Sequence, residues 1–147
     1  MVGRRILSSE EVKRVLHRMG LEIMERHYGA ELPFLMPASE RGRPIAEYLL
    51  TVLDREGVKA TMSLSPPSTR PVLLVDDVLY TGRTLLACIQ ELAAQHLPPQ
   101  IEVLVLVDRG HRRYPIYPDY VGVRLATTLQ EYVRVKTQPD GWEVWLE

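Results

Sequence analysis

The sequence predicts an α/β fold with a single doubly wound, mainly parallel sheet and a C-terminal β-hairpin. Three observations support this prediction. Strand-like segments alternate with amphipathic helical segments, the strongest strand segments are continuous apolar runs, and the last two strands flank a tight-turn sequence. The length of 147 residues is that of one ordinary domain, so residues 1–147 are assigned to a single unit.

Each predicted element has its own local signals. The first helix begins at Ser8, which forms an S-x-x-E capping box with Glu11, and it ends near Gly29. A second helix has Pro44 in its first turn, where proline is tolerated, and ends before Gly57. The remaining predicted elements are strands at 32–36, 58–64, 71–75, 101–107 and 120–122, a helix at 83–95, and hairpin strands at 132–136 and 142–146 around a Pro-Asp-Gly turn.

The composition is that of a soluble globular protein, with 46% hydrophobic and 25% charged residues. The net charge of −1 gives no overall basic field for nucleic acid, although basic residues cluster locally. The lone Cys88 excludes an internal disulfide and suits a reducing compartment. The sequence has no apolar run near the ~20 residues of a membrane span and no signal-peptide core, so we expect a cytoplasmic protein without membrane contact.

Charge and glycine concentrate in three predicted loops, at 37–42, 76–82 and 108–113. Each of these loops follows a predicted parallel strand. Ligands of open α/β sheets bind outside the carboxyl ends of the strands. We therefore expect the functional site where these three loops meet.

The most informative stretch is VLLVDDVLYTGRT at residues 72–84. Asp76 and Asp77 follow an apolar strand, and two adjacent carboxylates repel each other unless a cation or hydroxyl donors meet them. The turn that follows opens a helix, whose free backbone N–H groups favour a phosphate. It contains Thr81, Gly82, Arg83 and Thr84. Hydroxyls at one end and phosphate at the other predict a ribose phosphate ligand, with Mg²⁺ nearby.

This stretch has two alternative interpretations. An aspartate pair before a Thr-Gly turn is also compatible with a helix N-cap and a turn that have no ligand. The acidic strand end of a P-loop NTPase is a second alternative. That class requires the G-x-x-x-x-G-K-[ST] motif, which the sequence lacks.

Residues 72–84 resemble the phosphoribosyl-pyrophosphate (PRPP) signature of type I phosphoribosyltransferases. Together with LVDRGHR at 106–112, Pro115-Ile116 and DYVG at 119–122, they are similar to the PyrR family in particular. The resemblance implies a uracil phosphoribosyltransferase that makes UMP and pyrophosphate, uses Mg²⁺ carried by PRPP without a confident protein ligand, binds an mRNA leader in attenuation, and forms a homodimer or larger homo-oligomer.

The resemblance also implies roles for individual residues. Asp76 and Asp77 would hold the ribose hydroxyls, and the turn at 81–84 would cradle the 5′-phosphate. Ser39, Arg41 and Gly42 would belong to the pyrophosphate loop. The catalytic residues would be Arg41, Asp76 and Asp77. Asp108 and Arg109 would lie on the base side of the pocket. The residues that would contact RNA are His17, Arg18, His111 and Arg112. The alternative for Arg41 and Arg109 is an ordinary surface ion pair, and for the basic residues of the first helix it is a solvated face.

The sequence departs from the family at several of these places. Only residues 65–70 stand where the family has a long flap, Glu40 replaces a threonine of the pyrophosphate loop, and Pro37 replaces a glycine. In the expected RNA face, a leucine replaces a histidine at position 21 and a valine replaces a lysine at 123. Two hypotheses follow: an enzyme with a trimmed lid, or a weakly catalytic or non-catalytic nucleotide sensor that binds RNA. A purine or orotate as the base is a third possibility.

Overall fold

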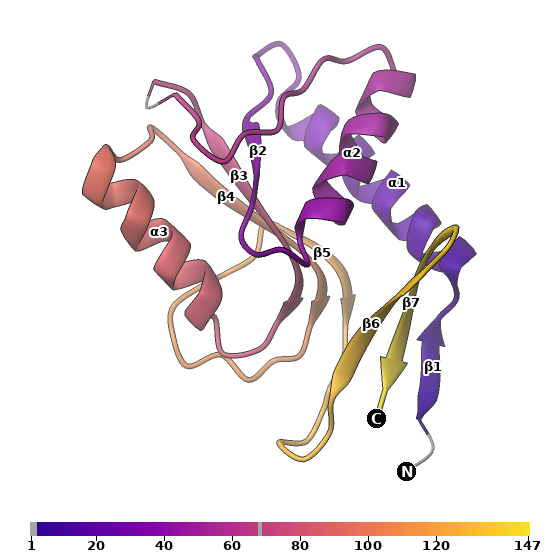
Figure 1. Ribbon diagram of the computed structural model, residues 1–147. Helices are drawn as coiled ribbons and strands as arrows, with labels where there is room; N and C mark the ends of the chain where they lie inside the picture. The colour runs from indigo at the N-terminus through magenta and orange to yellow at the C-terminus, as the bar shows by residue number, and fades with distance from the viewer. Residues whose placement is uncertain (1–2, 68) are drawn as a thin grey trace.

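The computed structural model describes residues 3–67 and 69–147, which form two sheets and three helices (Figure 1). A four-stranded parallel sheet has the order β2-β3-β4-β5, and a three-stranded antiparallel sheet has the order β1-β7-β6. The elements in chain order are β1 (Arg4–Leu7), α1 (Ser9–Arg26), β2 (Phe34–Pro37), α2 (Arg43–Arg55), β3 (Val72–Leu79), α3 (Arg83–Gln95), β4 (Ile101–Asp108), β5 (Tyr120–Arg124), β6 (Val133–Gln138) and β7 (Gly141–Leu146). The α/β prediction with a parallel sheet and a terminal hairpin is confirmed.

The strand predicted at 58–64 is reduced to one bridge. Met62 pairs with Leu35 in parallel, on the side of β2 that faces away from β3. The pairing stops there because the chain turns back at Pro66 and Pro67, which have no N–H group to donate to a ladder. The loop predicted at 65–70 lies within the described residues except for Ser68.

The Met62 bridge nevertheless explains why helices cover both faces of the sheet. From β2 the chain crosses through α2 to Met62 on one side, and from β3 it crosses through α3 to β4 on the other side. Crossovers of one hand that run in opposite directions put their helices on opposite faces. Figure 1 shows α3 on one face and α1 with α2 on the other. The order reverses between β2 and β3, which is where an α/β sheet opens a ligand crevice.

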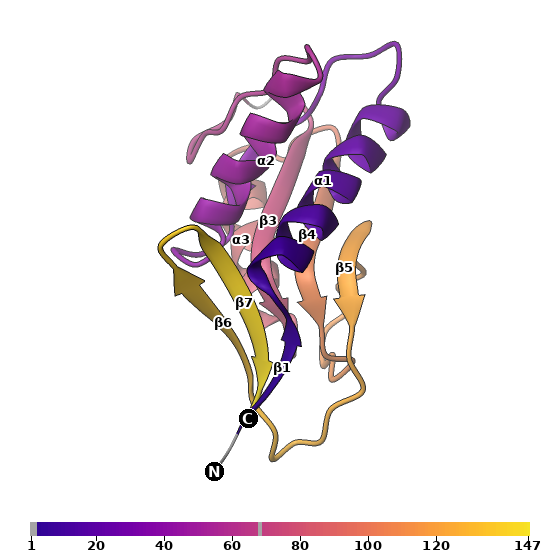
Figure 2. The ribbon, with the colours of Figure 1, turned by 90° about the vertical axis from the view of Figure 1, so that its right-hand side faces the viewer.

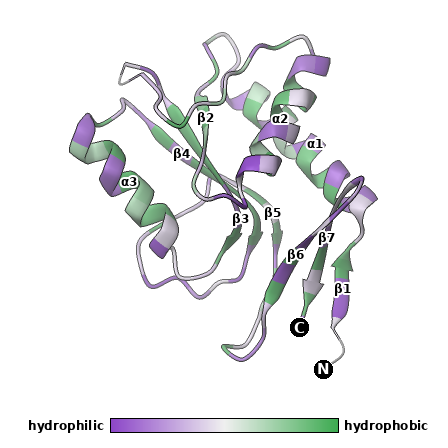
Figure 3. Cartoon of the chain, viewed as in Figure 1, coloured by the Kyte–Doolittle hydropathy of each residue, from purple (hydrophilic) through white to green (hydrophobic). Residues whose placement is uncertain are grey.

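Side chains of the central strands alternate between two cores. Leu73 and Val75 of β3 face α1 and α2, whereas Val72 and Leu74 face α3. Because both faces of the sheet are covered, the first half of β3 is a continuous apolar run, as the hydropathy colours of Figure 3 show. The buried apolar area of the two cores holds the parallel sheet together.

The second sheet contains a strand that the sequence did not indicate. The strand β1 pairs antiparallel with β7, and Leu7 lies opposite the buried Val144. With four residues and exposed Arg4 and Arg5 in its first half, β1 has no apolar alternation to recognise. Figure 2 shows this sheet beside the N-terminal part of α1, against which β7 packs. The predicted hairpin is confirmed as β6 and β7.

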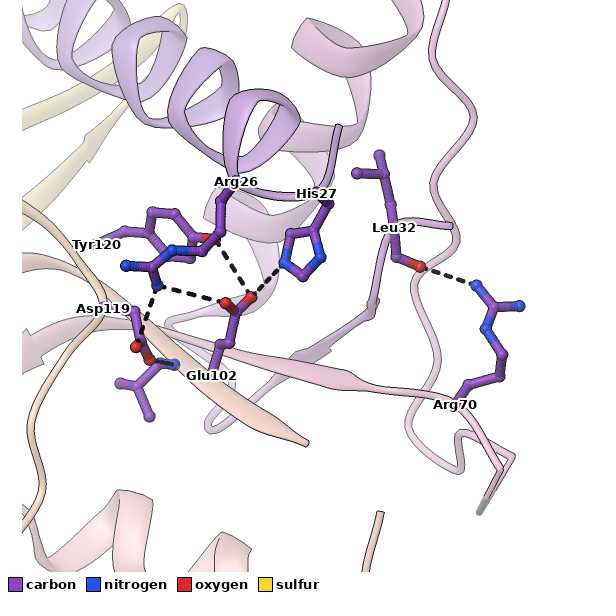
Figure 4. Close-up of polar contacts among 8 residues, drawn as sticks. Arg26, His27, Leu32, Arg70, Glu102, Asp119 and Tyr120 are labelled. Atoms are coloured by element: carbon purple, nitrogen blue, oxygen red, sulfur yellow. Dashed lines mark hydrogen bonds and ion pairs between the residues drawn. The ribbon is translucent and has the colours of Figure 1, made fainter. Parts of the chain in front are cut away.

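A buried polar network fastens the end of α1 to the edge where the parallel strands begin (Figure 4). The Glu102 carboxylate, 2% exposed, accepts hydrogen bonds from Nε2 of His27 at 2.7 Å and from the Tyr120 hydroxyl at 3.2 Å. Arg26 donates to the same carboxylate at 3.3 Å and pairs with Asp119 at 3.2 Å. Burial, followed by the nearby Glu102 carboxylate, raises the pKa of the Tyr120 hydroxyl above its ordinary value of 10. The network lies at the edge opposite the loops with the candidate site residues.

Candidate active site

A cavity of about 640 Å³ opens at the carboxyl end of the parallel sheet. It lies beside β3 and the start of α3, with the hairpin strand β6 as a further wall. Its lining residues are Ser39, Arg41, residues 76–85 and residues 132–135. The cavity thus brings together the predicted aspartate pair, the predicted phosphate turn and part of the predicted pyrophosphate loop. Gly42, Asp108 and Arg109 do not line it.

The residues of the hairpin strand were not predicted for the site. Tyr132, Val133, Arg134 and Val135 have ordinary strand-forming sequence without a recognisable motif. They reach the cavity because β7 packs on α1 and β6 pairs with β7, which brings β6 into contact with β3. That placement depends on long-range packing, which a local pattern does not contain.

The two aspartates lie inside β3 rather than after it, because the strand continues to Leu79. Both are buried, Asp76 to 4% and Asp77 to 8% exposure. One oxygen of each is held internally. Oδ1 of Asp76 accepts from Ser39 Oγ at 2.8 Å and from the Asp77 N–H at 2.9 Å, and Oδ1 of Asp77 accepts from the Val78 N–H at 2.8 Å. The second oxygens leave acceptor capacity beside the cavity.

Of the two aspartates, Asp76 has the shifted pKa. Burial, followed by repulsion from Asp77, raises the pKa of the Asp76 carboxyl from 3.8 to about 7. The hydrogen bond from Ser39 opposes the shift by stabilising the charged form. Near neutral pH the protonated and ionised forms of this carboxyl are therefore both populated. A hydrogen-bond donor or a cation that binds to it favours the ionised form. Strongly shifted carboxyl groups beside a cavity are typical of functional sites.

The turn after β3 leads directly into the N-terminus of α3 beside the cavity. Gly82 adopts φ +91°, a conformation that favours glycine, and its carbonyl accepts from the Leu86 N–H at 2.9 Å as α3 begins. Gly82 has no side chain to cap α3, and the first turn presents the positive end of the helix dipole. The Thr81 hydroxyl accepts from the Arg83 N–H at 3.2 Å and so shapes the turn.

The loop that follows β2 packs directly on the backbone of β3. A Cβ atom on Gly42 would lie 2.2 Å from the carbonyl oxygen of Val75, so no side chain fits there. The Gly42 N–H donates to the Ser39 carbonyl at 3.1 Å and closes the turn. Glu40 and Arg41 are exposed at its tip. Arg41 lines the cavity.

Asp108 and Arg109 are buried behind the cavity. Asp108 shapes its own loop, because Oδ1 accepts from the Gly110 N–H at 2.9 Å. The Arg109 guanidinium lies over the Tyr80 ring, with its central carbon 4.1 Å from the ring centre. It also donates hydrogen bonds to the segment 127–131. Arg109 is therefore a buried residue bound to backbone carbonyls and an aromatic ring, and not the surface ion-pair partner of the alternative interpretation.

The four predicted RNA contacts all have partners within the chain. Nε2 of His17 lies 3.5 Å from Glu56, and Arg18 donates to the carbonyls of Val121 and Gly122 at 3.3 and 2.8 Å. The other two predicted RNA contacts, His111 and Arg112, lie in the loop after β4. His111 contacts Thr127, and Arg112 lies 3.6 Å from Asp108 and over the Tyr117 ring. Two of the four thus lie on α1 and two at the carboxyl edge of the sheet.

Two further findings concern the described part of the chain. None of the helices in residues 3–67 and 69–147 is long and apolar enough to cross a membrane. Within the same ranges, no group of three or more His, Cys, Asp or Glu side chains is placed to hold a metal ion.

Comparison with known proteins agrees with this geometry. Residues 52–135 match the family model of the phosphoribosyl transferase domain. A hypoxanthine-guanine phosphoribosyltransferase from Bacillus anthracis has the same fold, with a TM-score of 0.71 at 17% identity over 82% of this chain and 81% of that one. A hypoxanthine phosphoribosyltransferase from Trypanosoma cruzi, solved with its product IMP, gives 0.70 at 20% identity over 82% and 75%. The fold and the site therefore define a phosphoribosyltransferase.

Curated relatives narrow the class further. Bifunctional protein PyrR of Deinococcus radiodurans is 40% identical, over 95% of this chain and 91% of that protein. Bifunctional protein PyrR of Herpetosiphon aurantiacus is 35% identical, over 92% and 90%. The chain belongs to the PyrR family. The alignment with the Deinococcus protein runs over 166 positions, more than the 147 residues of this chain, so that relative contains residues that this chain lacks.

Proposed function

We propose that the protein transfers the phosphoribosyl group of PRPP to uracil and makes UMP and pyrophosphate. The bond from the anomeric carbon to the pyrophosphate oxygen breaks, a bond from that carbon to N1 of uracil forms, and the N1 proton passes to solvent. The observation that carries the proposal is one cavity with an acidic pair at one end and an uncapped helix N-terminus at the other. That spacing suits a sugar between its hydroxyls and its 5′-phosphate.

Each side chain of the cavity has a task in this reaction. The second oxygens of Asp76 and Asp77 accept hydrogen bonds from the two ribose hydroxyls and hold the sugar in place. The N–H groups and hydroxyls of residues 81–84 bind the 5′-phosphate. Arg41, exposed beside the cavity, offsets the charge that develops on the departing pyrophosphate.

Magnesium would arrive with PRPP rather than reside in the protein. Carboxylate oxygens are ligands that Mg²⁺ accepts, so Asp76 and Asp77 would face the cation that PRPP carries. The ion supplies charge neutralisation as the pyrophosphate leaves. Glu40, exposed next to Arg41, places a negative charge beside the same anion and weakens its binding.

The segment between α2 and β3 does not line the cavity in its described part. It returns toward the start of β2, where Arg70 donates to the Leu32 carbonyl at 2.8 Å (Figure 4). A lid from this segment would therefore not close over the sugar. Because water exclusion stabilises charged transition states, we expect slow turnover.

A PRPP-dependent conversion of radiolabelled uracil to UMP tests the proposal. Wild type should form UMP with Mg²⁺ present, and Asp77→Asn should lose most of the rate because the ribose loses an acceptor. Asp54→Asn, a matched change at an exposed carboxylate of α2, should keep the wild-type rate. Hypoxanthine and orotate in place of uracil should give no nucleotide. No UMP at high enzyme concentration, or equal rates in wild type and Asp77→Asn, would remove the proposal.

RNA binding is a second candidate function, favoured by the loop after β4. Arg112 and Arg113 are exposed there beside exposed aromatic rings, and Tyr117 is 70% exposed. Arginine with aromatic side chains suits phosphates and unpaired bases. Binding should weaken steeply with salt and be lost in Arg112→Ala, measured by filter retention of an RNA leader. No retention at low salt would exclude it. A homodimer or larger homo-oligomer, implied by the family, is tested by the mass in solution.

A further inference from the structure

We infer that Arg109 is a positioning residue that fixes the β6 wall of the cavity, and that it does not contact the base. The inference rests on the proposed uracil transfer, which it deepens by naming what shapes the base side. Arg109 is 6% exposed and does not line the cavity, although Tyr80, on which its guanidinium lies, does.

The Arg109 guanidinium is occupied by the segment that leads into β6. Nε donates to the Thr127 hydroxyl at 3.2 Å, and Nη2 donates to the carbonyls of Thr128 and Glu131. The segment has its own turn, in which the Thr128 N–H donates to the Glu131 carboxylate at 2.7 Å. A planar fork with several donors can hold two carbonyls and a hydroxyl at once, which a lysine ammonium on a flexible stem does not reproduce.

One face of the guanidinium lies on Tyr80 of the signature turn. Its central carbon is 4.1 Å from the ring centre, and the His111 ring meets the same tyrosine edge-on at 5.6 Å. His111 also contacts the backbone and the hydroxyl of Thr127, at 2.6 and 3.0 Å. Arg109, His111 and Tyr80 thus clamp residues 127–131 against the turn that follows β3.

The clamp joins the two walls of the cavity. Tyr80 lies on the wall with the aspartates and the phosphate turn, and Tyr132, immediately after the clamped segment, begins the wall formed by β6. The signature turn keeps its place without the guanidinium, because its contacts to the next loop are made by the backbone. The Arg109 N–H donates to the Leu79 carbonyl at 3.0 Å, and the Arg113 N–H donates to the Thr81 carbonyl at 2.9 Å. Loss of the guanidinium should therefore displace the β6 wall and spare the phosphate corner.

Steady-state kinetics of four variants test this inference. Arg109→Met and Arg109→Lys should raise the KM for uracil by about tenfold or more, with the KM for PRPP within twofold of wild type. Thr127→Val, which changes only the far side of the clamp, should raise the same KM in the same direction. Arg55→Met, the same chemical change at an exposed side chain at the end of α2, should leave both constants unchanged.

Hydrogen exchange gives a readout that does not need turnover. Backbone amides of residues 126–133 should exchange faster in Arg109→Met and in Thr127→Val than in wild type, whereas amides of β1 and α1 should not change. Full rescue of the uracil KM by lysine, or a raised uracil KM in Arg109→Met with unchanged Thr127→Val, would show direct action on the base and overturn the inference. Unchanged exchange in 126–133 would overturn it as well. If wild type forms no UMP, the proposed function fails while the exchange measurement still decides the clamp.

Discussion

Because Asp76 and Asp77 are buried side by side in β3, we expect a substitution that weakens ligand binding to stabilise the fold. The substitution is Asp76→Asn, which removes the charge and keeps an oxygen at Oδ1 for the Ser39 hydroxyl and the Asp77 N–H. The Asp76 pKa rises from 3.8 to about 7 on folding, because of burial and repulsion from Asp77. The folded state therefore binds this proton more tightly than the unfolded chain does.

The sign and size of the effect follow from that shift. Between about pH 4 and pH 7 the unfolded chain has lost the proton and the folded chain retains it, so the free energy of unfolding falls as the pH rises. Each pKa unit corresponds to about 1.4 kcal/mol, and the loss reaches at most about 4 kcal/mol above pH 7. Asparagine does not titrate. Asp76→Asn should equal wild type near pH 4 and exceed it by about 2–4 kcal/mol at pH 8.

Urea unfolding followed by the fluorescence of Trp142 and Trp145, in EDTA at several pH values between 4 and 8.5, measures this difference. Asp54→Asn is the matched control, since this aspartate is exposed, and its difference from wild type should stay within about 0.5 kcal/mol at every pH. A stability gain of Asp76→Asn that does not depend on pH would refute the reasoning. A loss of stability at pH 8 would do the same.

Three other substitutions test separate parts of the structure. Gly42→Ala places a Cβ 2.2 Å from the Val75 carbonyl oxygen, so it should lower the free energy of unfolding by about 1–3 kcal/mol, measured by urea titration. The same change should weaken PRPP binding at least tenfold, measured by calorimetry. Wild-type affinity in this variant would contradict the packing argument. Glu40→Thr removes an exposed negative charge from the pyrophosphate loop and should lower the KM for PRPP about two- to fivefold in the uracil assay, whereas a higher KM would show that Glu40 assists binding. Glu102→Ala leaves His27 and Tyr120 without their shared acceptor and should cost about 2–4 kcal/mol in thermal unfolding with an unchanged uracil KM; a changed KM would connect this edge to the site.

Local signals in the sequence predicted most of the fold. The helix at 83–95 is confirmed as α3, and the capping box of Ser8 and Glu11 is present at the start of α1 with both hydrogen bonds. The strand β1 was not predicted, because its pairing with β7 joins residues from the two ends of the chain. The strand predicted at 58–64 was wrong in extent, since one bridge at Met62 is all that pairs.

The candidate site divides in the same way. Residues 76–84 lie together on one strand and turn, so they could be recognised as one motif in the sequence. The β6 wall and the Arg109 clamp depend on how two sheets pack, and no spacing in the sequence reports that contact. The sequence placed Arg109 on the base side, but the partners of its guanidinium could be found only from the structure.

Calorimetric titration of PRPP with and without Mg²⁺ tests the central claim most directly, namely that the cavity between the aspartates of β3 and the start of α3 binds a phosphorylated ribose. Wild type should bind PRPP in a Mg²⁺-dependent manner, and the double variant Asp76→Asn, Asp77→Asn should bind it at least a hundredfold more weakly while still folded. Absence of binding by wild type at millimolar PRPP, or equal affinity in the double variant, would contradict the account.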